Sequence, residues 1–160
     1  MDRLPRLLLC AYLFLSAYSL GGGVVEGFVY YPAWKTVGPE EFSRFHQSLS
    51  ERLLPAFVLP FFLSVVVNAA VLWRPPVGLS RKLVAMALAL NGVIVVVTVG
   101  WAIPIQMQLS EGLSLTAIDR LIALDRPLRL VPGLVVGALN LVMMERMLAV
   151  RPVEREAMRG

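Results

Sequence analysis

The fold class is decided by apolar segments of one kind, best represented by LVAMALALNGVIVVVTVGWAI, residues Leu83–Ile103, which contains no charged side chain. A helix needs about 20 apolar residues, each rising 1.5 Å, to cross a hydrocarbon core of about 30 Å. Outward from this segment, three more runs meet the requirement: Leu7–Tyr31, Leu53–Trp73 and Leu130–Val150. The sequence therefore predicts an all-α integral membrane four-helix bundle.

Composition agrees with a lipid-embedded chain. The 160 residues are 58% hydrophobic and 16% charged, with a mean hydropathy of +0.72, whereas soluble domains are nearer 45–50% apolar and about 25% charged. A chain of this length is expected to form one domain, here residues 1–160 as a single transmembrane domain. The lone Cys10 excludes an internal disulfide, a cysteine zinc cluster and a CxxC redox pair. No cofactor and no metal site are predicted.

The distribution of charge predicts an orientation. One side of the membrane would hold the N-terminus, the connection after Trp73 and the C-terminus, with nine basic and four acidic residues and a net charge of +5. The other side would hold six basic and seven acidic residues, a net charge of −1. Because Lys and Arg are enriched in cytoplasmic loops, both termini are predicted to be cytoplasmic. Basic residues at the ends of apolar runs indicate a lipid bilayer as the partner and no nucleic acid.

The first apolar run allows two interpretations. Arg3, Arg6, the apolar stretch Leu7–Leu15 and the small residues Ala17-Tyr18-Ser19 are also features of a signal peptide. The apolar character resumes after Gly21–Gly23 and continues through Tyr31, which favours a span. Glycines in a membrane helix let a neighbouring helix approach closely, so these are predicted to form a packing face. A GxxxG pattern, Gly133 and Gly137, gives the fourth span the same signal.

Each external loop is predicted to contain a short amphipathic helix. The first begins at Gly38-Pro39-Glu40-Glu41, since proline and acidic residues suit a helix N-terminus. The second is capped by Ser114 or Thr116, has an apolar face through Leu115–Ile122, and ends at Pro127. It would lie on the membrane surface or cover the bundle mouth. Aromatic residues at Tyr30–Trp34 and Trp101 resemble an interfacial belt.

Prolines and asparagines interrupt the spans. Pro55 and Pro60 are expected to open the outer half of the second span, and Pro104 to disrupt the end of the third. Asn91 and Asn140 lie at similar depths, where they are either interhelical hydrogen-bonding groups or ligand-binding groups. No internal repeat is evident, and neither is an inverted repeat or a charged path of the kind transporters use.

Few side chains could carry chemistry. Glu26 near the outer end of the first span is either an interfacial carboxylate or a buried acid or base, because ionisable residues inside spans are functional candidates. His46, the only histidine, is either a packed interfacial residue or a proton-transfer group, and it cannot form a multi-histidine metal site. Gln106 would place an amide at the outer mouth.

Three short features resemble the small four-span bacterial membrane proteins related to anthrone oxygenases. They are Tyr30-Tyr31-Pro32-Ala33 at the exit of the first span, Phe45-His46 in the external helix, and the Pro-Ile-Gln segment followed by Ile118–Ile122 and Arg129. The resemblance covers most of the chain as an architecture and implies a bacterial inner membrane. Named members of that family are similar to cofactor-free oxygenases that act on polycyclic phenols.

Two functions are therefore expected to compete. In the first, an outer-face pocket takes a small lipophilic or aromatic molecule, with oxygenase-like chemistry. His46 or Glu26 would act as the base. The pocket and its ligand contacts would come from aromatic and amide side chains, namely Trp34, Tyr31, Trp101, Gln106, Asn91 and Asn140. In the second, the chain is a non-catalytic membrane subunit or scaffold that packs against partner helices, in a homo-oligomer or a larger membrane complex.

Overall fold

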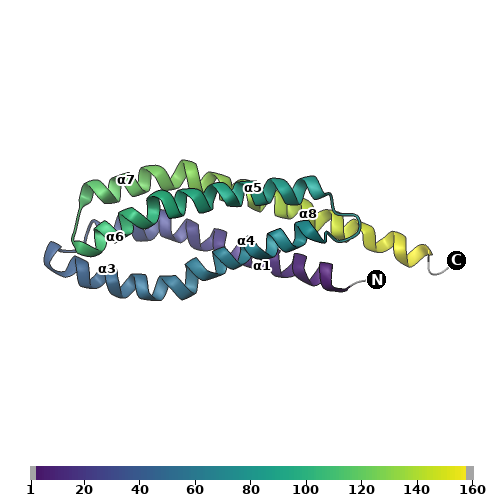
Figure 1. The fold of residues 1–160 in the computed structure, drawn as a ribbon, viewed down its shortest axis with the longest axis horizontal. Helices are drawn as coiled ribbons and strands as arrows, with labels where there is room; N and C mark the ends of the chain where they lie inside the picture. The colour runs from purple at the N-terminus through teal and green to yellow at the C-terminus, as the bar shows by residue number, and fades with distance from the viewer. Residues whose placement is uncertain (1–2, 158–160) are drawn as a thin grey trace.

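The computed structural model describes the backbone of residues 3–157 and the side chains of residues 3–149, so the predicted charges at positions 2 and 151–159 lie outside the described side chains. Four long antiparallel helical rods form one bundle, with both ends of the chain and the α4–α5 connection at one end (Figure 1). The described residues contain no strand, and the predicted all-α four-helix bundle is confirmed.

Each rod consists of two α-helices joined by a five-residue π-helical turn. The first rod is α1 (Arg3–Val25), η1 (Glu26–Tyr30) and α2 (Tyr31–Trp34), and the second is α3 (Pro39–Leu53), η2 (Leu54–Val58) and α4 (Leu59–Trp73). The third is α5 (Arg81–Val97), η3 (Thr98–Ala102) and α6 (Ile103–Glu111), and the fourth is α7 (Leu115–Asp125), η4 (Arg126–Leu130) and α8 (Val131–Ala157).

All four rods are long and apolar enough to cross a membrane, which is the composition of a multi-pass membrane protein. Their candidate spans contain 32, 35, 31 and 35 residues. A helix of this length is roughly 48 Å long, well beyond a hydrocarbon core of about 30 Å. Large apolar side chains face outward, among them Phe14 at 70% and Val66 at 65% exposure. The rods therefore have room for an extramembrane section.

The two predicted amphipathic helices exist as α3 and α7, but they are not separate surface elements. Each continues through a π turn into the following apolar helix. Pro127 was expected to end the second one, and it lies instead inside η4, where the helix continues. Ser114 caps α7 as predicted, with its Oγ accepting from the Ala117 amide at 3.3 Å. The section of the bundle that contains α3 and α7 is thus an extension of the long apolar helices.

A proline explains the position of each π turn. The second residue after every π turn is proline: Pro32, Pro60, Pro104 and Pro132. In each case the residue before that proline donates its amide to the carbonyl five residues earlier, as Tyr31 does to Glu26. Proline cannot donate an amide and its ring crowds the carbonyl four residues earlier, so a wider turn relieves that crowding.

The π turns show that the chain contains an internal repeat, contrary to the expectation from sequence. Adding 72 to the residue numbers of η1 and η2 gives the residue numbers of η3 and η4, without a gap. The same shift pairs Pro32 with Pro104, Pro55 with Pro127, Pro60 with Pro132 and Asn68 with Asn140. Both copies start from the same end of the bundle, so they are parallel hairpins and not an inverted repeat. Most other paired positions differ in residue type, which hid the repeat.

Small residues bring the helices together where the sequence predicted a packing face. A Cβ at Gly22 would lie 1.6 Å from the Phe57 ring, so only glycine fits there. Gly133 and Gly137 contact Leu20, whose side chain would be 3.4 and 3.0 Å from their added Cβ atoms. Gly21 and Gly23 have no atom that close to an added Cβ. The GxxxG pattern of the fourth rod therefore packs against the Leu20 side chain of α1.

Two apolar cores stabilise the bundle at different levels. One, near the α2–α3 and α6–α7 connections, includes Tyr31, Trp34, Phe42, Leu109 and Ile118. Tyr31 and Trp34 are almost fully buried in it, so the expectation that they belong to an interfacial aromatic belt is wrong.

The other core, near the chain termini, includes Leu9, Tyr12, Val71, Val84 and Met143. The π turns lie between these two levels.

Candidate functional site

A cavity of about 340 Å³ lies between the four rods and between the two cores, and it is partly open to the surface of the bundle. Residues of all four rods line it, and every π turn contributes at least one of them. The volume is at the lower end of the range of small-molecule sites, about 300–1,000 Å³. Most of its wall area is apolar, and eleven polar or charged side chains also line it: Ser16, Ser19, Glu26, Tyr31, Ser50, Ser64, Asn91, Thr98, Gln106, Asp125 and Arg129.

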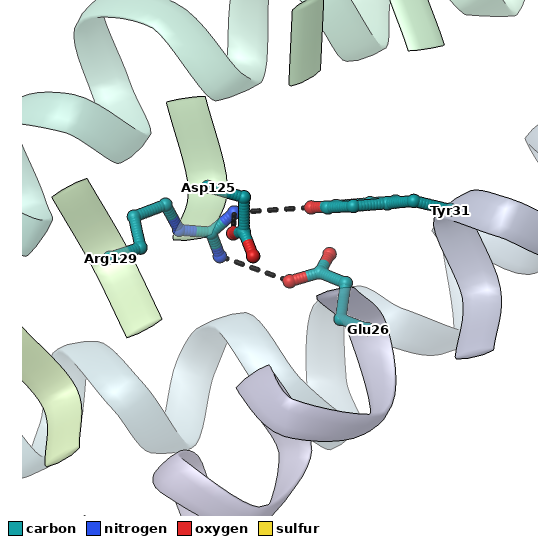
Figure 2. A network of polar contacts seen from close by, with 4 residues as sticks. All are labelled: Glu26, Tyr31, Asp125 and Arg129. Carbon is teal, nitrogen blue, oxygen red and sulfur yellow. Dashed lines mark hydrogen bonds and ion pairs between the residues drawn. The ribbon is translucent and has the colours of Figure 1, made fainter. Parts of the chain in front are cut away.

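Four of these side chains form a network that joins the first and fourth rods (Figure 2). Arg129 Nη2 donates to Glu26 Oε2 at 3.0 Å, and Nη1 lies 2.9 Å from Asp125 Oδ1. The same Nη1 donates to the Tyr31 hydroxyl oxygen at 3.1 Å. Glu26, Asp125 and Arg129 have side chains that are 13%, 4% and 18% exposed. Glu26 is therefore a paired carboxylate inside the bundle, not a residue facing lipid.

Asp125 has the least satisfied position in the network. Its side chain is 96% buried and lines the cavity, yet Oδ2 has no hydrogen-bond partner. The absence of a side chain at Gly27 makes room for it, because an added Cβ would lie 2.6 Å from Oδ2. A buried carboxylate oxygen without a donor is costly. The network thus contains an unpaired acceptor that is buried against Gly27.

The repeat accounts for the shape and polarity of the cavity. Eight pairs of residues related by the 72-residue shift line it on both sides: Ser19 and Asn91, Glu26 and Thr98, Tyr31 and Ile103, Leu53 and Asp125, Phe57 and Arg129, Val58 and Leu130, Phe61 and Gly133, and Ser64 and Val136. The cavity therefore lies where the two hairpins face each other. The charged residues Glu26, Asp125 and Arg129 correspond to the uncharged residues Thr98, Leu53 and Phe57, so the repeat does not extend to the charges of the cavity wall.

His46 lies behind the cavity wall and does not line it. Its side chain is almost fully buried, stacked on Phe42 and edge-on to Trp34 with ring centroids 5.7 and 5.0 Å away. Nε2 lies 2.8 Å from the Gln106 side-chain amide and Nδ1 lies 3.1 Å from Ser110 Oγ. Gln106 does line the cavity. His46 therefore contacts the cavity through Gln106.

The hydrogen bonds around His46 indicate how its protons are placed. Gln106 Oε1 faces Nε2, and an amide oxygen can only accept, so Nε2–H donates to Gln106. A neutral imidazole then has Nδ1 left as an acceptor. The Ser110 hydroxyl lies 3.1 Å from Nδ1 and 3.1 Å from the Gln106 main-chain carbonyl, and its rotation lets it donate to either one. His46 fits a role that holds Gln106 in position.

The remaining predicted site residues lie in different surroundings. Asn91 lines the cavity. Asn140, predicted to be either an interhelical or a ligand-binding group, is not among the lining residues and donates to Ser16 Oγ at 2.7 Å. Trp34 packs against Tyr31 and His46 in the core. Trp101 is 51% exposed and is not among the lining residues. The structure brings Glu26, Tyr31, Gln106 and Asn91 to one cavity.

Sequence reasoning missed Asp125 and Arg129 as site residues. Asp125 falls in the external helix predicted to end at Pro127, and Arg129 directly precedes the span predicted from Leu130. One signal could have found them, since Asp and Arg four residues apart form an ion pair on one helix face. Reading Pro127 as a helix terminus hid this spacing. A turn that continues through the proline keeps both side chains directed at the first rod.

The site offers no evident metal centre. Within the part of the chain whose side chains are described, no group of three or more His, Cys, Asp or Glu residues could hold a metal ion. The two carboxylates of the network already pair with Arg129. What the arrangement can do chemically is accept hydrogen bonds at Glu26 and Asp125 and exclude water with its apolar walls.

Comparison of the chain with protein-family models, with curated proteins and with solved structures found no match. The resemblance to anthrone-oxygenase-like proteins accordingly stays a prediction. Function has to be argued from the cavity itself.

Proposed function

We propose that this protein binds a small lipophilic molecule in the cavity between its four rods. The single observation that carries the proposal is an apolar cavity of about 340 Å³ with Glu26, Asp125 and Arg129 gathered at one wall. Ionisable side chains inside membrane helices are expensive and usually mark a functional path or site. An arrangement that serves packing alone would more simply fill this space with apolar side chains, as in the two flanking cores.

The experiment measures binding of a neutral naphthalene probe, 1-naphthylmethanol, to the purified full-length protein in detergent micelles. Calorimetric titration into protein is compared with titration into protein-free micelles at the same detergent concentration. Saturable binding near one probe per chain is expected. A signal that equals partitioning into empty micelles would contradict the proposal.

A matched pair of variants assigns the binding to the cavity. Gly23 lines the cavity and an added Cβ there meets no atom within 4 Å, so Gly23→Phe should fill the space and weaken binding at least tenfold. Gly21 has the same freedom but is exposed and does not line the cavity, so Gly21→Phe should bind like the parent. Equal losses in both variants would place the probe elsewhere.

The alternative function, a non-catalytic scaffold for partner helices, predicts a bundle packed solidly throughout. The cavity favours a ligand over that alternative. Oxygenase-like chemistry would need a base that faces the ligand, and Glu26 meets that condition while His46 acts through Gln106. We infer a bacterial inner-membrane location with both termini cytoplasmic, which the distribution of basic residues supports.

A further inference from the structure

The cavity has two chemically different halves, and this difference defines the kind of molecule it would hold. On one side are Glu26, Tyr31, Asp125 and Arg129. The residues related to them by the 72-residue shift are Thr98, Ile103, Leu53 and Phe57, which also line the cavity and are mostly apolar. A molecule with a polar group at one end and an apolar body fits this division in a single orientation.

The polar half contains more acidic groups than basic ones. One guanidinium, that of Arg129, lies between two carboxylates, those of Glu26 and Asp125. With both carboxyl groups ionised, the formal charge of these three groups is −1. A buried charge that has no counter-charge must gain a proton or a hydrogen-bond donor to be tolerated.

The network leaves carboxylate groups at the cavity wall. Glu26 Oε2 and Asp125 Oδ1 are paired with Arg129, whereas Asp125 Oδ2 is unpartnered and buried against Gly27. An ionised carboxylate can only accept hydrogen bonds. A ligand anion would meet two carboxylates, whereas a ligand N–H or O–H would offer them a charge-assisted hydrogen bond.

We propose that the ligand carries a hydrogen-bond-donating head group, a hydroxyl or a protonated amine, bound beside the carboxylates of Glu26 and Asp125, with its apolar body against Phe57, Leu53 and Ile103. This inference rests on the proposed function and adds the chemistry of the head group and its orientation. Gly27 takes part by leaving the space that Asp125 occupies.

The test uses four matched naphthalene probes on the full-length protein in micelles, each corrected for partitioning into empty micelles. They are 1-naphthylmethanol, 1-naphthylmethylamine, 1-methylnaphthalene and 1-naphthoate. At least one of the two donor probes should bind ten times or more tightly than methylnaphthalene, and naphthoate should bind most weakly. A tighter alcohol indicates a neutral hydroxyl ligand, and a tighter amine indicates an ammonium ligand.

Variants locate the donor-binding group. Asp125→Asn should reduce the advantage of the donor probe over methylnaphthalene at least fivefold. Asp119→Asn is the control, because Asp119 pairs with Lys35 on the exposed surface of the bundle. If Asp125→Asn does not fold, Glu26→Gln takes its place, and the ranking of the four probes on the parent protein decides alone if neither folds.

The two proposals fail in different ways. Binding of methylnaphthalene or naphthoate as tight as that of both donor probes would overturn the donor head group and leave the cavity as a binding site. A donor advantage that survives in folded Asp125→Asn would also overturn it. The absence of saturable binding for all four probes would overturn the proposed function itself.

Discussion

At the scale of single residues, Gly27 leaves no room for a side chain beside the polar network. Gly27→Ala would place a methyl group 2.6 Å from Asp125 Oδ2, and Oδ1 of that carboxylate is held by Arg129. Overpacking of this kind costs about 1–3 kcal/mol, which exceeds the helix propensity that alanine gains over glycine, about 1 kcal/mol. The thermal unfolding midpoint should fall, and ligand affinity should fall with it.

Gly21→Ala provides the comparison for that prediction. Gly21 lies in α1, where an added Cβ meets no atom within 4 Å, so its helix propensity should raise the midpoint slightly. If Gly27→Ala were as stable as Gly21→Ala, the close approach to Asp125 would not affect the stability of the bundle.

Asn68 and Asn140 occupy equivalent positions in the two hairpins but have different partners. Asn140 donates to Ser16, whereas neither polar atom of the fully buried Asn68 side chain has a hydrogen-bond partner. Replacing an unpartnered buried amide with an apolar group of similar size is neutral or stabilising. Asn68→Leu should therefore raise the free energy of unfolding by roughly 1 kcal/mol.

Asn140→Leu should have the opposite effect. It leaves the Ser16 hydroxyl without its donor, which costs about 1 kcal/mol. Unfolding in mixed micelles with increasing denaturing detergent measures both variants against the parent. If Asn68→Leu and Asn140→Leu destabilised the protein to the same degree, Asn68 would have a polar role in the bundle.

At the scale of the element, the π turns are the devices that shape the cavity. In a π turn the amide donates to the carbonyl five residues earlier instead of four, so the turn contains one residue more than a turn of α-helix. Removing one residue from η3 should restore an α-helix while the flanking helices keep their faces. Val99 is the residue to delete, since it is 52% exposed, and Pro104→Ala removes the proline that requires the wider turn.

We expect the variant with Val99 deleted and Pro104→Ala to stay folded and to lose affinity for the cavity probe. The matched control deletes Val93 from α5 in the same Pro104→Ala background, which rotates every later residue of the rod by about 100°. Val93 is 46% exposed, so the control loses a similar side chain. Equal stability of the two deletions would show that η3 is not a one-residue insertion.

At the scale of the whole molecule, the structure allows a direct test of orientation. The chain has a single cysteine, Cys10, so a Cys10→Ser background accepts one new label. Thr36 and Val77 are exposed in connections at opposite ends of the bundle. In intact cells a membrane-impermeant maleimide should label Thr36→Cys and should reach Val77→Cys only after permeabilisation. The reverse pattern would invert the predicted topology.

Much of the architecture could be predicted because it depends on local chemistry. Apolar runs of about 20 residues determine the four spans, and basic residues at their ends predict the orientation. The sequence did not predict in the same way that the helices continue through their prolines. Proline in a span was read as a stop or kink, whereas a π turn lets the helix pass through all four equivalent positions. The same error separated Asp125 and Arg129 from the site.

By itself, the sequence determined the helical class, the number of rods and the presence of Glu26 in an apolar environment, because each follows from the residue types within one segment. The tertiary structure decided which polar groups meet. Arg129 lies 103 residues after Glu26, and only the packing of the fourth rod on the first joins them. The parallel repeat likewise became visible only from the register of the π turns. The two hairpins share their backbone geometry, whereas the side chains that a ligand would meet differ between them.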